Sequence, residues 1–133
     1  MTVRKPYDDV LEALRAAPED LALLAKLAQL QERDGDREAA AWTCLRIAEC
    51  HLGHGFQLKA VASAKQALKL HPKHTAAREL VAVNLVALGL MPDATPHLQQ
   101  LLKHYTALGR RDDVVRILGL LSSSGPMTPG EVA

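Results

Sequence analysis

Residues 41–74 read AWTCLRIAECHLGHGFQLKAVASAKQALKLHPKH. The stretch contains two helix-like runs that are separated by Gly53-His54-Gly55 and followed by a break at Pro72. Across the 133 residues of the chain, 23 Leu and 21 Ala stand against nine Val and two Ile. Because Leu and Ala favour helices, whereas strands favour β-branched and aromatic residues, the composition predicts an all-α fold.

Proline and glycine divide the rest of the chain in the same way. Thr75 is the expected N-cap of one of the resulting helices. The turns between helices are short, so consecutive helices are expected to be antiparallel neighbours. Seven helices are predicted, over about residues 6–17, 18–34, 36–52, 56–70, 75–89, 92–109 and 112–121.

A repeat becomes visible when the chain is aligned on Gly35, Gly55, Gly89 and Gly109. The residues five, nine and twelve positions after each glycine are small or apolar, and these offsets place them on one stripe of the following helix. The four sets are Ala40, Cys44 and Ile47; Ala60, Ala64 and Ala67; Ala94, Leu98 and Leu101; and Val114, Leu118 and Leu121.

This spacing resembles the tetratricopeptide repeat, a 34-residue helix-turn-helix unit. Residues 41–74 fit its register with Ile47, Ala48, Gly55, Ala60, Ala67 and Pro72 at positions 7, 8, 15, 20, 27 and 32. Residues 75–108 follow the same register. The aromatic residue that the family has at position 11 occurs only as Tyr105, four residues before Gly109, and the equivalent positions before the other three glycines hold Gln31, His51 and Leu85. The resemblance implies antiparallel helix pairs stacked as a right-handed superhelix over residues 1–121. Residues 122–133 are rich in Ser, Gly and Pro and are expected to form a flexible tail or a linker.

Charge and motifs exclude several functions. The formal net charge of +1 argues against nucleic-acid binding, and the absence of a long apolar run argues against membrane insertion. With no apolar leader, a cytoplasmic location is expected. No phosphate loop, nucleophile elbow or zinc-protease motif is present, so neither enzymatic activity nor a cofactor is expected.

Cysteine and histidine provide a weak metal-site signal. Cys50, His51 and His54 lie close together in the sequence, but no fourth ligand has matching spacing, so no metal site is predicted. The histidines of the turns are expected at the surface. Cys44 is expected to be a small core residue, and Cys50 to be more exposed.

The resemblance also suggests a binding surface. In tetratricopeptide-like arrays the first helix of each pair lines a concave groove that holds a partner peptide or helix. The matching positions that we expect to contribute are Gln29, Glu32, Arg33, Trp42, Leu45, Glu49, Leu52, Glu79, Val83 and Val86. This groove would be apolar with a few acids.

The predicted function is therefore that of a non-catalytic scaffold or adaptor that binds another protein. Two alternatives keep the same fold. In one the apolar face is filled by a second copy, giving a homodimer. In the other the chain is the regulatory domain of a larger protein.

Overall fold

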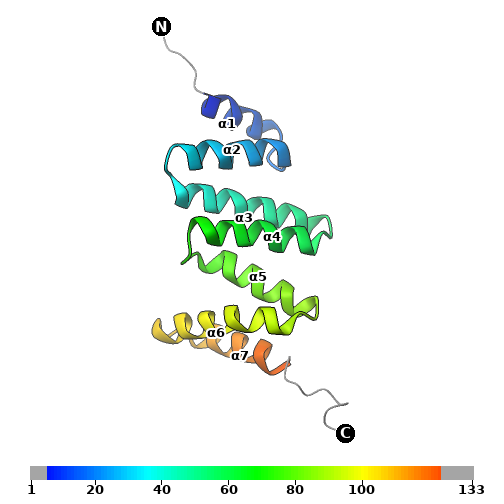
Figure 1. Cartoon of the computed structure of the whole chain (residues 1–133), viewed down its shortest axis with the longest axis vertical. Helices are drawn as coiled ribbons and strands as arrows, with labels where there is room; N and C mark the ends of the chain where they lie inside the picture. The colour runs from blue at the N-terminus through cyan, green and yellow to red at the C-terminus, as the bar shows by residue number, and fades with distance from the viewer. Residues whose placement is uncertain (1–5, 124–133) are drawn as a thin grey trace. The chain divides into compact units, whose positions relative to one another are not determined.

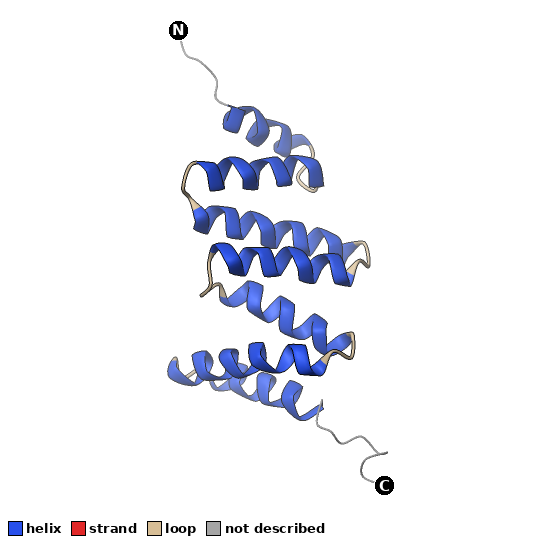
Figure 2. Cartoon of the chain, in the orientation of Figure 1, coloured by secondary structure: helices blue, strands red, loops and turns tan. Residues whose placement is uncertain are grey.

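The computed structural model describes residues 6–123, which are helical apart from the turns (Figures 1 and 2). Within this range the seven helices are α1 (Pro6–Ala16), α2 (Leu21–Arg33), α3 (Arg37–Gly53), α4 (Gln57–Leu70), α5 (Thr75–Ala87), α6 (Met91–Ala107) and α7 (Arg111–Ser123). The predicted all-α class and helix count are confirmed for the described residues. Helix α7 ends two residues later than predicted, and the remainder of the predicted tail lies outside the described range.

The chain divides into two compact units, residues 1–77 and 78–133, with the boundary inside α5. In the first unit α1 packs against α2, α2 against α3, and α3 against α4. In the second unit α6 packs against α7. The turns are short, so successive helices in each unit run antiparallel. No helix among residues 6–123 combines the length and apolarity needed to cross a membrane.

One turn geometry occurs four times. Gly35, Gly55, Gly89 and Gly109 have backbone φ angles of 83°, 81°, 77° and 71°, which a side chain with a Cβ rarely adopts. After each glycine, the next N–H donates to the carbonyl five residues earlier; Phe56 to His51, at 2.8 Å, is one example. This is the Schellman arrangement that ends a helix. The four glycines on which the sequence was aligned therefore mark one repeated helix-ending turn.

Side chains complete the helix ends of the first unit. The Asp20 and Asp36 carboxylates accept hydrogen bonds of 3.1 Å from backbone N–H groups in the first turns of α2 and α3. At the C-terminal end of α4, the carbonyls of Lys69 and Leu70 accept hydrogen bonds from the Arg37 guanidinium of α3. Unpaired N–H and C=O groups at helix ends are costly, so these contacts fix where α2, α3 and α4 begin or end.

The predicted stripe of small or apolar residues is buried in α4 and α6, and in α3 apart from Ile47, which is half-buried. Ala40, Ala60 and Ala94 have no solvent exposure, which allows close approach of neighbouring helices. The prediction is wrong for α7, where Leu118 is exposed and the fully buried residue is Ile117. Helix α7 packs on α6 along a face that is rotated from the one predicted.

Candidate functional site

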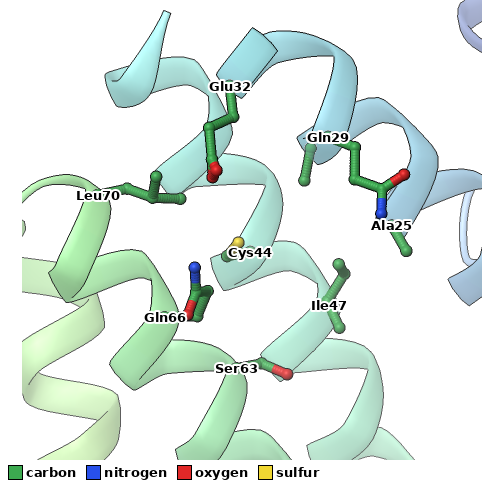
Figure 3. A pocket seen from close by; sticks show the side chains of 9 residues that line it. Ala25, Gln29, Glu32, Cys44, Ile47, Ser63, Gln66 and Leu70 are labelled. Carbon is green, nitrogen blue, oxygen red and sulfur yellow. The ribbon is translucent and has the colours of Figure 1, made fainter.

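A pocket of about 260 Å³ opens where α2, α3 and α4 meet in the first unit (Figure 3). Helix α3 supplies its floor, whereas α2 and α4 form its two sides. Apolar groups make up much of the surface, and polar side chains stand among them. The lining residues are Ala25, Ala28, Gln29, Glu32, Cys44, Ile47, Ser63, Gln66 and Leu70.

Four of these side chains carry polar groups that can bind a ligand: Gln29, Glu32, Ser63 and Gln66. Within residues 6–123, none of the four side chains forms a hydrogen bond or an ion pair with another part of the protein. Figure 3 shows the Glu32 carboxylate and the Gln66 amide directed toward Cys44 from opposite helices. The pocket thus combines an apolar floor with solvent-accessible donors and acceptors that have no partner within the described protein, as ligand sites do.

Cys44 lies at the floor and is buried, as the sequence predicted. Burial raises the pKa of its thiol, and the negative charge of Glu32 raises this pKa further. The thiol therefore stays protonated and contributes a weakly polar, apolar-like surface rather than a nucleophile.

A buried polar pair holds α2 against α3 beside this pocket. The Thr43 hydroxyl donates to the Gln31 side-chain oxygen at 2.6 Å, and both residues are buried. The Gln31 amide points to the Tyr7 hydroxyl of α1 at 3.5 Å. Since a buried amide without partners would be destabilising, this contact restricts the register of α2 on α3. Sequence reasoning missed the pair because no local pattern joins positions 31 and 43.

A second hollow of about 300 Å³ lies between α1 and α2 and is lined by Pro6, Asp9, Val10, Leu23 and Lys26. Asp9 already interacts with another part of the protein. This hollow therefore offers fewer polar side chains without an internal partner than the pocket of α2, α3 and α4, which we take as the candidate site.

Of the residues predicted to bind a partner, Gln29 and Glu32 line this pocket. Arg33 is exposed at the end of α2, outside the lining. On α3, Glu49 is exposed and Leu52 half-buried, and neither lines the pocket. Leu45 is only 4% exposed, so its predicted place on a binding surface is corrected: it belongs to the core, because its face of α3 packs against neighbouring helices.

Trp42 is 52% exposed and lies outside the pocket lining, with its ring 4.3 Å from the ring of His74. His74 was expected at the surface but is 3% exposed. Its Nδ1 accepts a hydrogen bond of 3.2 Å from the N–H of Ala77, so His74, rather than the predicted Thr75, caps the start of α5. Burial lowers the pKa of His74, and the nearby His71 lowers it further. The cap therefore uses a neutral imidazole.

The remaining predicted residues lie in the second unit. Glu79 accepts from the Tyr105 hydroxyl at 2.7 Å and pairs with Arg116, which also bonds Asp113. Burial raises the pKa of Tyr105, and the bond to Glu79 contributes to that rise. Glu79 thus links α5, α6 and α7, and it is engaged within the protein.

On the same helix, Val83 is 37% exposed and Val86 is half-buried. Three neighbouring apolar residues of this helix, Val81, Ala82 and Leu85, are buried. An apolar side chain thus remains at the surface of α5.

In the cysteine–histidine cluster, the exposure of Cys50 differs from the prediction. Cys50 is 9% exposed and packs with Val10, Leu14, Leu24 and Leu27, so the expectation that it is more exposed is wrong. The cause is that α1 and α2 cover this face of α3. Among the described residues, no group of three His, Cys, Asp or Glu side chains is arranged to hold a metal ion.

Comparisons with protein-family models, with curated proteins and with solved structures returned no significant match. The function of this site therefore has to be inferred from its own geometry.

Proposed function

We propose that the chain is a non-catalytic scaffold of tetratricopeptide-like helical repeats that binds a segment of another protein in the pocket of α2, α3 and α4. The observation that carries the proposal is the combination of an apolar floor with four polar side chains that have no partner within residues 6–123. An extended peptide offers both an apolar side chain for the floor and backbone amides for the polar groups.

The size of the pocket supports a peptide over a cofactor. At about 260 Å³ it falls below the range of roughly 300–1,000 Å³ that is typical of sites for drug-sized molecules. A single large side chain and its backbone would occupy much of such a volume. The pocket is therefore suited to anchor one side chain of a longer segment.

The repeated turn supports the helical-repeat part of the proposal. Each of the four glycine turns ends one helix in the same conformation, and buried alanines follow at matching positions in three of the four next helices. A cytoplasmic location belongs to the same proposal.

The proposal can be tested with a surface-displayed library of random peptides. Wild-type protein is expected to enrich peptides that share an apolar anchor, and Ala25→Phe is expected to abolish the enrichment because it fills the pocket from an exposed position. Ala107→Phe is the matched control, since Ala107 is exposed on α6 in the other unit. Enrichment that survives in Ala25→Phe, or no enrichment by the wild type, would refute the proposal.

Self-association is a second candidate function, and one observation on α7 favours it. Val115 is 68% exposed, and the exposed Leu118 lies one turn further on the same helix. A pair of exposed apolar side chains could meet the same pair on a second copy. Light scattering over a range of concentrations tests this, with Val115→Glu expected to keep the chain monomeric.

A further inference from the structure

The charge of the pocket is set by one residue. Among its nine lining residues Glu32 carries the single formal charge, and no cation pairs with it within residues 6–123. The basic side chains of α2, α3 and α4 are not part of the lining; they are Lys26, Arg33, Arg37, Arg46, Lys59, Lys65 and Lys69. Arg37 comes near the edge of the pocket, where its guanidinium donates to the carbonyls of Lys69 and Leu70. The lining therefore presents one negative charge at the edge of an apolar surface.

The Glu32 carboxylate is close enough to the pocket to interact electrostatically with a bound ligand. In Figure 3 it points from α2 across the pocket, between Leu70 and Cys44. The pKa of the Cys44 thiol on α3 is raised mainly by burial, and the negative charge of Glu32 is the second cause. The electrostatic influence of Glu32 thus extends to the floor, where an apolar anchor would lie.

The side-chain amides of the pocket can bind the backbone of a peptide. Gln29 on α2 and Gln66 on α4 stand on opposite sides of the pocket, and each offers one acceptor and two donor hydrogens. A peptide backbone can use both, because it presents N–H and C=O groups alternately on its two sides. Ser63 adds a hydroxyl on the α4 side.

We propose that the occupant is a peptide segment of another protein in which an aliphatic anchor residue is directly next to Lys or Arg. The anchor fills the space above Cys44 and Ile47, the amides of Gln29 and Gln66 bind the backbone, and the basic residue pairs with Glu32. This inference rests on the proposed function and adds the chemistry of the partner. The charged contact lies at the exposed edge, so it contributes about two- to fivefold to affinity and weakens with added salt.

The test applies the same displayed peptide library to wild-type protein, Glu32→Gln and Glu32→Lys. The wild type is expected to enrich peptides with Lys or Arg beside an aliphatic residue. Glu32→Gln is expected to enrich the aliphatic residue without the basic one, and Glu32→Lys to enrich Asp or Glu in its place. Glu38→Lys makes the same charge change on an exposed position of α3 outside the pocket, and it is expected to select like the wild type.

The outcomes separate the two proposals. Suppose that the wild type enriches aliphatic peptides and that Ala25→Phe does not bind them. If these peptides have no basic residue beside the aliphatic one, or if Glu32→Lys selects them equally well, this inference is overturned and the proposed function stands. No enrichment by the wild type would overturn both. A concentration-dependent increase in mass that Glu32→Lys abolishes would make a second copy the occupant, and it would likewise overturn this inference.

Discussion

Two glycines at the turn between α3 and α4 allow a test in which the same substitution has opposite effects. Gly55 has a φ of +81°, whereas Gly53 is the last residue of α3 and is not among the glycines with positive φ. A Cβ added at either position would meet no atom within 4 Å. Replacing each with alanine therefore changes backbone preference without creating a steric clash.

The expected magnitudes follow from this difference. In Gly55→Ala the left-handed conformation costs about 1–2 kcal/mol. The more restricted unfolded chain offsets about 0.4–1 kcal/mol of that cost, leaving a net loss of about 1 kcal/mol. In Gly53→Ala the helical conformation suits alanine, so a gain of about 0.5–1 kcal/mol is expected.

Thermal unfolding followed by far-ultraviolet circular dichroism measures both variants. A protein of this size shifts its Tm by roughly 2–6 °C for each kcal/mol, so the two melting temperatures should differ by roughly 3–12 °C, with the wild type between them. If both variants move in the same direction, the repeated turn does not depend on the left-handed glycine, and the reasoning is refuted.

Three further predictions concern other parts of the chain. Ala60→Leu should cost about 1–3 kcal/mol because Ala60 is fully buried, and an unchanged Tm would contradict that packing. The pKa of His74 in the folded protein lies below its ordinary value of 6.5, so the unfolded chain binds a proton more readily than the folded one. The neutral His74 cap therefore contributes fully to stability above pH 6.5, and this contribution is lost as the pH falls toward the folded pKa. His74→Asn, which can still cap α5, should flatten that part of a Tm–pH curve. Tyr105→Phe should cost about 1–2 kcal/mol by removing the 2.7 Å bond to Glu79, and Tyr7→Phe, whose contact is 3.5 Å, should cost clearly less.

Much of the fold could be predicted because its signals are local. Gly55 and its three equivalents are recognisable in the sequence, since the left-handed turn requires a residue without a Cβ. The burial of Ala60 and Ala94 follows from helical periodicity, which places them on one stripe. The same periodicity failed for Leu118, because the face that α7 turns to α6 is decided by packing.

Less of the candidate site could be predicted. Gln29 and Glu32 were expected at a binding surface and line the pocket, but Ser63 and Gln66 were missed. These two residues are on α4, the second helix of its pair, whereas the resemblance to tetratricopeptide repeats placed the groove on first helices alone. The repeat register alone predicted that Leu45 lies at the surface, whereas in the structure it lies in the core.

The sequence by itself determined the helices and the turns that join them, because helix propensity, caps and left-handed glycine act within a few residues. Tertiary structure alone decided which polar groups are buried and which have no partner within the protein. His74 caps α5 through a local bond to Ala77, but its burial depends on other elements, with the Trp42 ring of α3 centred 4.3 Å from its own ring. The Glu32 carboxylate lies without a partner beside an apolar floor, because of how α2, α3 and α4 pack.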